Sequence, residues 1–382
     1  MASASAAAAF VPRLRFPLSE SIPRSYYLGH HHAGLREITN RLSSIGLVLE
    51  CRDYRVPLTS WNPHLDRAVA GRNRIIVYTH RDLGIDSPHS VERDLRRYHA
   101  GHNAANSAVA GHRVVFWRKD DPSSTKALLR HVADAARAVD SLTGVRALVV
   151  GMPNVGKSTL LNRLRTHGMA KKASVARTGA QPGVTRKLSS PVRILEGGGS
   201  FARDAASSAS SASSSDGGSS ADGGSLGEGV FVLDTPGVFM PYVEDAEDMV
   251  KLALAGSVKD DRIPMEILAD YLLYRLNRLD PALYARYSPP TNEVNDFLAG
   301  VARRTGKLKA GGVPNVEAAA DWAVKQWRAG QLGRFVLDDV NDDAIRLKEM
   351  AREGGGPTSL SQARKREKEM RRERAMNKQK AL

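Results

Sequence analysis

The 382-residue sequence predicts an α/β fold, in which a mostly parallel six-stranded sheet is covered by helices and followed by a small all-α domain. Three observations predict this fold. Short runs rich in β-branched residues alternate with stretches of helical periodicity. A glycine-rich turn joins one of these runs directly to a helix. From about residue 246 onwards the pattern becomes helical alone.

Six runs have the apolar character of buried strands. We expect strands at residues 46–51, 74–79, 113–117, 146–151, 190–195 and 229–234. Helices are expected near residues 33–44, 89–100, 124–140 and 157–167. Strands that alternate with helices are typical of a sheet whose neighbouring strands run parallel.

The first 24 residues have the composition of an organelle transit peptide. They are rich in Ala and Ser and contain Arg13, Arg15 and Arg24 against a single acid, Glu20. A disordered chain terminus is the simpler alternative. We therefore assign residues 1–24 to a transit peptide or disordered segment, with the mitochondrion as the favoured destination.

Composition also sets the other boundaries. We expect the α/β domain at residues 25–243 and a helical C-terminal domain at 244–340. Within the first lies a Gly/Ser-rich insert, 197–228, which has too few large apolar side chains to order itself. Residues 341–382 form a basic tail, either a solvated helix or a nucleic-acid-binding arm.

The charge balance indicates an anionic partner. The net charge is +15, from 56 basic and 41 acidic residues, which suits RNA or a membrane surface, although solubility alone is an alternative explanation. The single Cys51 excludes disulfides within the chain and zinc sites built from cysteines. The sequence contains no run of 18 apolar residues, so it predicts no membrane-spanning helix.

The turn "GMPNVGKST" matches the P-loop pattern in full and predicts a cradle for nucleotide phosphates. Its glycines let backbone N–H groups turn towards the β-phosphate, and the next helix points its N-terminus at the anion. Lys157 supplies a positive charge, and Ser158 offers a hydroxyl to Mg²⁺. The expected phosphate-binding residues of this loop are Asn154, Val155, Gly156, Lys157, Ser158 and Thr159.

Two downstream segments complete a nucleotide switch. "VFVLDTPGV" ends a strand in Asp234, which can reach Mg²⁺ through water, and the N–H of Gly237 can sense the γ-phosphate. Between the two motifs, "QPGVT" supplies Thr185 as the residue that closes on Mg²⁺ when a triphosphate is bound. Taken alone, this segment is also compatible with an ordinary turn.

The guanine-reading segment is expected upstream, in "RIIVYTHRDLG". The Asp82 carboxylate can accept from guanine N1–H and from the exocyclic amine, a donor pair that adenine lacks. Thr79 replaces the usual Asn, and His80 replaces the usual Lys. An ordinary turn at a strand end is the alternative. A second base-contacting loop is placed at Phe116–Arg118.

The order of these motifs is base reader, phosphate cradle, switch threonine and γ-phosphate sensor. In most switches the base reader comes last, so this sequence predicts a circularly permuted G domain. Permutation is compatible with a compact domain whose original ends lie close together. The helical domain then follows directly after the sensor.

With these motifs, the chain resembles the mitochondrial GTPase 1 family, which is related to bacterial ribosome-biogenesis GTPase A. The resemblance runs from about Tyr27 to Asp339. It includes the motifs above and "GLVLECRDYRVPLTSWNP", where Asp53, Arg55 and Pro57 correspond to the family's Asp-Ala-Arg-x-Pro. It also includes "DYLLYRLNRLDPALYARY", "FLAGVARRTGKLKAGG" and "WRAGQLGRFVLDD" in the helical domain.

The resemblance implies two further site residues. Val238 occupies the position where many switches carry a water-orienting Gln, and the family uses a His near the N-terminus instead. That role falls on His30, with His31 as the second choice, although three adjacent histidines also suit a surface patch. Asn154 corresponds to the Asn that helps to hold K⁺ in related GTPases; bonding to its own loop is the alternative.

The resemblance also implies GTP and GDP as ligands and the rRNA and proteins of the mitochondrial large ribosomal subunit as partners. We expect a monomer that binds peripherally to the matrix side of the inner membrane. Phosphate contacts are expected from Lys307, Lys309, Arg334 and the cluster at 364–380. The alternatives are a nucleotide-holding rRNA scaffold with little hydrolysis, a P-loop ATPase, or a cytosolic or nucleolar permuted GTPase.

Overall fold

The computed structural model describes residues 10–19, 22–26, 29–105, 113–169, 190–197, 226–240, 242–243 and 245–353, with a few more near the C-terminus. Thr185 and most of the Gly/Ser-rich insert lie outside the described residues, as does nearly all of the 364–380 cluster.

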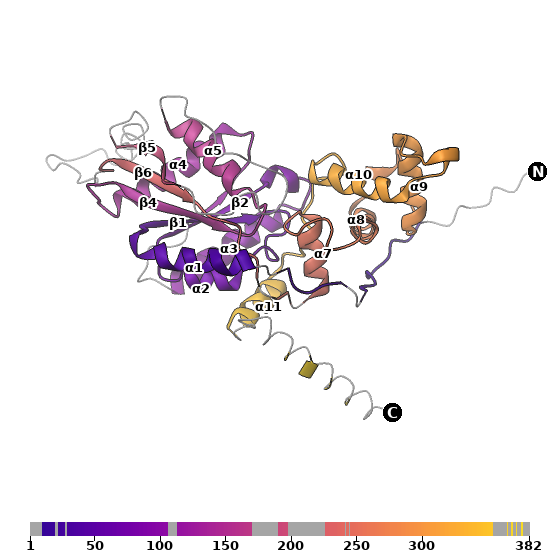
Figure 1. Ribbon diagram of the computed structural model, residues 1–382, viewed down its shortest axis with the longest axis horizontal. Helices are drawn as coiled ribbons and strands as arrows, with labels where there is room; N and C mark the ends of the chain where they lie inside the picture. Colours follow the sequence, from indigo (N-terminus) through magenta and orange to yellow (C-terminus); the bar gives the residue numbers. More distant parts are fainter. Residues whose placement is uncertain are drawn as a thin grey trace, which may run out of the picture.

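Six strands form one sheet, as predicted (Figure 1). All neighbouring pairs run parallel except the edge pair β5 and β6, which is antiparallel. Each strand lies within two residues of its predicted position. The strands are β1 (Leu47–Asp53), β2 (Arg74–Thr79), β3 (Arg113–Phe116), β4 (Val145–Gly151), β5 (Val192–Glu196) and β6 (Gly229–Asp234).

The strand order β3-β2-β1-β4-β6-β5 confirms the permuted G domain. β4, which leads into the P-loop, lies in the middle of the sheet. The strands that precede it in sequence fill one side, and those that follow fill the other. Strands β2 and β6, which precede the predicted base reader and the predicted γ-phosphate sensor, therefore end at the same edge of the sheet as β4.

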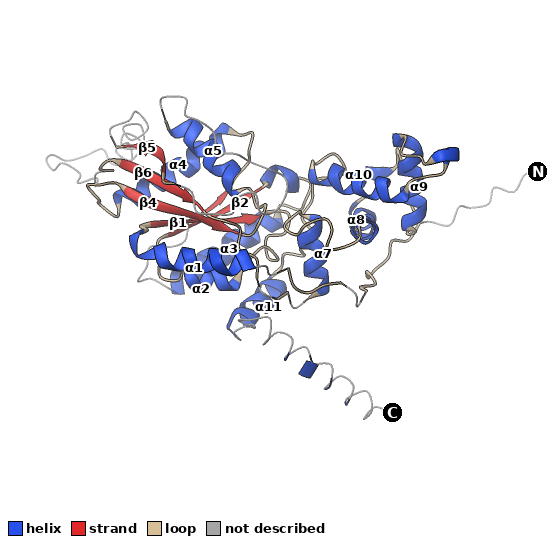
Figure 2. Cartoon of the chain, viewed as in Figure 1, coloured by secondary structure: helices blue, strands red, loops and turns tan. Residues whose placement is uncertain are grey.

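Helices cover both faces of the sheet (Figure 2). On one face lie α1 (Gly29–Arg41), α2 (Pro63–Ala68) and α3 (Ser90–Ala105). The other face carries α4 (Pro122–Arg137) and α5 (Lys157–Gly168). α2 was not predicted, because six residues are too few for a periodic pattern. It is specified by its cap, since the Asn62 side chain accepts from the amide of His64 at 3.0 Å.

The helical domain consists of α7 (Ala246–Leu254), α8 (Met265–Leu279), α9 (Val294–Thr305) and α10 (Val316–Arg328). It lies beside the end of the sheet where the nucleotide motifs gather (Figure 1). Its apolar core is continuous with that of the sheet. Among the described residues, no helix combines the length and apolar character needed to cross a bilayer.

Parts of both chain ends pack on the rest of the protein. The predicted basic tail begins with α11 (Asp342–Glu353), which packs on the G domain through Ile345, only 6% exposed. Residues 10–19 of the predicted N-terminal segment lie against α8, where Arg13 pairs with Asp270 at 2.5 Å. The assignments of residues 1–24 and 341–382 stay predictions.

Candidate nucleotide-binding site

The P-loop has the backbone that a phosphate cradle requires. Gly151 has φ +151°, and a Cβ there would lie 2.4 Å from the carbonyl oxygen of Cys51 on the neighbouring strand. Gly156 has φ +84° and Asn154 has φ +57°, so both adopt left-handed conformations. α5 begins at the next residue, Lys157, and its free N–H groups face the loop.

Lys157 is buried behind this loop. Its ammonium donates to the carbonyls of Met152 at 2.7 Å and Gly151 at 3.3 Å. Burial lowers its pKa, partly offset by the carboxylate of Asp234. A phosphate would bring a stronger acceptor to this charge, so the residue suits the predicted contact with β- and γ-phosphates.

Ser158 and Asp234 come together as a magnesium site requires. The Ser158 hydroxyl donates to a carboxylate oxygen of Asp234 at 2.5 Å. Burial raises the pKa of Asp234, and the Lys157 ammonium opposes the shift. Within the described chain, no group of three His, Cys, Asp or Glu side chains forms a metal site. Water and phosphate oxygens would therefore complete the shell, as is usual for Mg²⁺.

The γ-phosphate sensor lies directly on the P-loop. A Cβ at Gly237 would lie 2.5 Å from the Cα of Pro153, so only glycine permits this approach. The N–H of Val238 donates to the carbonyl of Gly151 at 3.1 Å. Val238 itself is 1% exposed, so its side chain cannot orient water. Gly237 therefore lies against the P-loop, and its predicted contact with the γ-phosphate stays a prediction.

The base-reader loop meets the P-loop. Thr79 is fully buried, and its hydroxyl donates to the carbonyl of Val155 at 2.7 Å. It therefore fastens the two loops together, and its predicted contact with guanine stays a prediction. The ring of His80 lies over Gly156, where a Cβ would be 3.5 Å from it. His80 has φ +55°, a conformation that tertiary contacts must hold.

Asp82 lies in the short 3-10 helix Arg81–Gly84 that follows β2. One of its carboxylate oxygens is buried, and no described residue donates a hydrogen bond to it. A buried acceptor without a donor is costly unless a ligand supplies one. The N–H groups of guanine are such donors, which is compatible with the predicted role.

The second base-contacting loop was predicted at Phe116–Arg118, and two of these side chains pack in or against the core. The ring of Phe116 stacks on Tyr78, with centroids 5.1 Å apart, and so belongs to the core. Trp117 is 1% exposed and its indole donates to Thr125 at 3.0 Å. Of the segment Phe116–Arg118, the backbone of Trp117 lies nearest the base reader, since its carbonyl accepts from Arg81 at 3.3 Å.

The N-terminal histidines lie on α1, beside the sensor. The backbone of His30 belongs to this helix, but its imidazole lies outside the described part of the chain. Nδ1 of His31 is 2.9 Å from the carbonyl oxygen of Gly237. The second-choice histidine therefore contacts the sensor, whereas the water-aligning role of His30 stays a prediction.

Asn154 reaches out of the nucleotide site. Its amide nitrogen donates to the carbonyl of Gly256, at the end of α7, at 2.8 Å. Arg55 makes a parallel link, since its guanidinium donates to the carbonyl of Ala255 at 2.9 Å. The P-loop is thus joined to the first helix of the helical domain. The role of Asn154 as a K⁺ ligand stays a prediction.

Asp53 and Arg55 form the buried centre of this junction. The guanidinium donates to both oxygens of Asp53, at 3.0 and 2.7 Å. Burial opposes the charge of Asp53, but Arg55 and then His80 hold its pKa well below the usual range. His80 lies 3.3 Å from the same carboxylate. The motif noted in the sequence therefore supports the base-reader loop.

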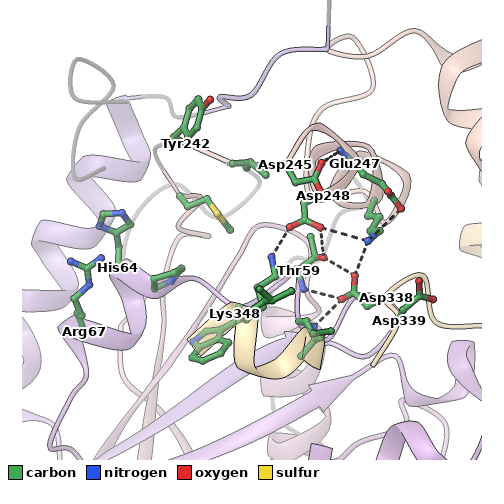
Figure 3. Close-up of a pocket in the computed structure, with 18 residues that line it drawn as sticks. Thr59, His64, Arg67, Tyr242, Asp245, Glu247, Asp248, Asp338, Asp339 and Lys348 are labelled. Atoms are coloured by element: carbon green, nitrogen blue, oxygen red, sulfur yellow. Dashed lines mark hydrogen bonds and ion pairs between the residues drawn. The ribbon is translucent and has the colours of Figure 1, made fainter. Parts of the chain in front are cut away.

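A cavity of about 500 Å³ lies between α2 of the G domain, α7 of the helical domain and α11 (Figure 3). One wall, which includes Met240 and Tyr242, is the chain leaving the sensor. On the opposite wall Asp338 accepts from the amides of Leu58 and Thr59, each at 2.9 Å. The sequence did not reveal this contact, because its partners lie far apart in the chain.

We expect Asp338→Ala to lower the free energy of unfolding by about 3–5 kcal/mol, the usual cost of breaking a buried charged contact. The change removes acceptors for two amides and the Thr59 hydroxyl, and leaves Lys251, 3.5 Å away, without that partner. Urea denaturation measures the effect. The neighbouring Asp339→Ala, whose side chain is 65% exposed, is the matched control and should change stability by less than about 1 kcal/mol. Equal effects of the two substitutions contradict the assignment.

The predicted phosphate contacts of the helical domain lie at its surface. Arg334 pairs with Asp86 at 3.2 Å, and its predicted contact with RNA stays a prediction. Lys309 and Lys307 lie beside the exposed turn between α9 and α10. Their predicted contact with RNA stays a prediction.

Comparison with known proteins gives relatives along most of the chain. Residues 146–298 match the family described as 50S ribosome-binding GTPase. Mitochondrial GTPase 1 of Schizosaccharomyces pombe is 34% identical over 357 residues, which covers 89% of this chain and 97% of that protein. Mitochondrial GTPase 1 of Schizosaccharomyces japonicus is 33% identical over 331 residues, covering 84% and 91%. Ribosome biogenesis GTPase A of Priestia megaterium is 29% identical over 324 residues, covering 83% and 97%.

Proposed function

Because the chain belongs to the mitochondrial GTPase 1 family, we propose that it is a GTP-hydrolysing assembly factor for the mitochondrial large ribosomal subunit. It binds rRNA in its GTP form and leaves after hydrolysis. The observation that carries the proposal is the junction of the base-reader loop with the P-loop. There the Thr79 hydroxyl donates to Val155, and His80 lies over Gly156, although the two loops are distant in sequence.

The chemistry follows from the positions of these groups. Backbone N–H groups of the P-loop and the ammonium of Lys157 bind the phosphates, and Asp82 selects guanine. Ser158 and, through water, Asp234 would hold Mg²⁺, which would supply positive charge near the phosphates. The N–H of Gly237 binds the γ-phosphate, so the sensor loop distinguishes GTP from GDP. Thr185 would be a further ligand of the metal in the GTP form.

Hydrolysis needs a group that aligns water, because Val238 is aliphatic and buried. We infer that the imidazole of His30 accepts a hydrogen bond from the attacking water. We also infer that K⁺ near Asn154 stabilises charge in the transition state, in place of an arginine finger. A faster rate in K⁺ than in Na⁺ buffer supports the second inference, and equal rates contradict it.

The partners follow from charge and from the family. The net charge of +15 supports rRNA as the ligand, with Lys307 and Lys309 among the phosphate contacts. We propose a mitochondrial location and peripheral binding at the matrix side of the inner membrane. The chain is proposed to act as a monomer. The names of the relatives, which include mitochondrial ribosome-associated GTPase 1 of Mus musculus, support the organelle.

The test is sedimentation of the tagged full-length protein with a mitochondrial extract. With a non-hydrolysable GTP analogue, we expect the protein to sediment with the large subunit. With GDP, we expect it to remain at the top of the gradient. Equal distributions in the two nucleotides contradict the assembly function.

A single-turnover assay with large subunits and K⁺ separates a GTPase from a nucleotide-holding scaffold. We expect subunits to accelerate hydrolysis, and His30→Ala to remove the acceleration while leaving GTP binding intact. If subunits have no effect and His30→Ala changes nothing, the scaffold is the better description.

A further inference from the structure

The peptide unit that follows the γ-phosphate sensor is held at both ends. Its N–H, from Val238, donates to the carbonyl of Gly151 in the P-loop at 3.1 Å. Its carbonyl, from Gly237, is 2.9 Å from Nδ1 of His31 on α1. These contacts fix the peptide plane that follows Gly237 and so help to hold the Gly237 Cα, from which the preceding plane with its own N–H extends.

His31 occupies this position in a buried environment. It is 1% exposed, and its ring lies near those of Tyr26 and Phe239, with centroids 5.9 and 6.2 Å away. The amide of Phe239 is 3.4 Å from the same Nδ1. A ring nitrogen either donates or accepts, so binding the Gly237 carbonyl requires the proton on Nδ1.

The chain before His31 reaches the helical domain. Among residues 10–19, Arg13 pairs with Asp270 of α8 at 2.5 Å, and its amide donates to Asn292 at 3.2 Å. The ring of Phe16 meets Tyr271 edge-on, with centroids 5.2 Å apart. The N-terminal segment is thus anchored on α8 by charge, by hydrogen bonds and by aromatic packing.

The same segment then contacts the sensor side. The carbonyl of Arg24 accepts from the amide of Val243 at 2.8 Å, on the chain that leaves the sensor. Tyr26 meets Phe239 edge-on, with centroids 5.5 Å apart. Further along α1, a Cβ at Gly34 would be 3.6 Å from Val238, so this helix lies against the sensor loop.

We propose that His31 is a positioning residue for the γ-phosphate sensor, and that residues 10–19 and 22–26 couple its contact with Gly237 to the helical domain. The proposal rests on the proposed function, since it concerns the same sensor. Displacement of α8 by a ribosomal ligand would act on the anchored segment and so on the direction of the Gly237 N–H. The helical domain would thereby alter the preference for GTP over GDP.

The first experiment uses the full chain and measures affinity for a non-hydrolysable GTP analogue and for GDP. His31→Phe keeps the ring contacts but removes Nδ1, and we expect the ratio of the two affinities to fall about five- to tenfold, as for one lost hydrogen bond. His31→Asn restores a donor near Nδ1 and should recover part of the ratio. Thr39→Ala, at an exposed position of the same helix, is the control and should leave the ratio unchanged.

The second experiment exchanges the charges of the anchor. Arg13→Asp and Asp270→Arg should each lower the affinity ratio, and the double variant should restore it. If all three variants keep the wild-type ratio and differ only in unfolding temperature, the segment is merely structural and the coupling is wrong. If His31→Phe leaves the ratio of the affinities for the GTP analogue and GDP unchanged, His31 is not a positioning residue.

These outcomes are separable from failure of the proposed function. In every variant GDP affinity should remain that of the wild type, because GDP lacks the phosphate that the sensor contacts. A wild-type protein without affinity for GDP contradicts the nucleotide site itself. A wild-type protein that binds both nucleotides, combined with an unaltered ratio in the variants, contradicts only the role of His31 and its anchor.

Discussion

Lys157→Ala is expected to lower the affinity for GTP and GDP by roughly 30-fold or more, equivalent to about 2 kcal/mol or above for loss of a charged partner in a desolvated contact. The ammonium of Lys157 is buried behind the loop and donates to carbonyl oxygens of Met152 and Gly151. In the complex it would instead face phosphate oxygens. Titration with a fluorescent GDP or GTP analogue measures the change.

Lys126→Ala removes the same charge from an exposed position of α4 and is the matched control. Its affinity should equal that of the wild type. Circular dichroism should show that Lys157→Ala still folds, because the P-loop backbone is set by its glycines and by contacts with Thr79 and Val238. If folded Lys157→Ala binds nucleotide as tightly as Lys126→Ala, the P-loop assignment is wrong.

Asp82→Asn is expected to weaken guanine nucleotides selectively, by roughly 100-fold. The substitution replaces two charge-assisted hydrogen bonds, each contributing about 1.5–3 kcal/mol, with one neutral acceptor and one unwanted donor. No described residue donates a hydrogen bond to the buried oxygen of Asp82, so a donor from guanine would satisfy it. Affinity for xanthosine diphosphate should rise in the variant, because xanthine presents a carbonyl where guanine presents its amine.

Inosine nucleotides provide the internal control for Asp82, since they lack only the exocyclic amine. The wild type should bind GDP more tightly than IDP, and Asp82→Asn should reduce the difference. Competition between GTP and ATP tests the ATPase alternative in the same assay. Equal affinity of the wild type for GTP and ATP would remove the base-reader assignment.

Much of the fold was predictable because it depends on local patterns. Each strand was placed within two residues, since a buried parallel strand needs a short continuous apolar run. The P-loop was identified because its backbone needs glycine at fixed positions. Gly156, with φ +84°, is one of them. The motif order was sufficient to predict permutation, because each motif must end at one edge of the same sheet.

Other parts of the site were not predictable from local patterns. The donation from the Thr79 hydroxyl to the carbonyl of Val155 was not expected, and its contact with guanine stays a prediction. The ion pair of Arg334 with Asp86 was not expected either, and its contact with phosphate stays a prediction. In both cases the residue type indicated a hydrogen-bonding or charged role correctly. The partner was decided by which other groups the fold brought within reach.

The sequence by itself thus determined the six strands and the order of the motifs, and it indicated which side chains to test for binding a guanine nucleotide. Only the tertiary structure decided that His31 contacts the carbonyl of Gly237, that Asn154 reaches Gly256, and that residues 10–19 lie on α8. The physical reason is the distance along the sequence over which each kind of interaction acts. Strand and turn preferences act over a few residues, whereas these contacts join segments that approach each other only after the cores have packed.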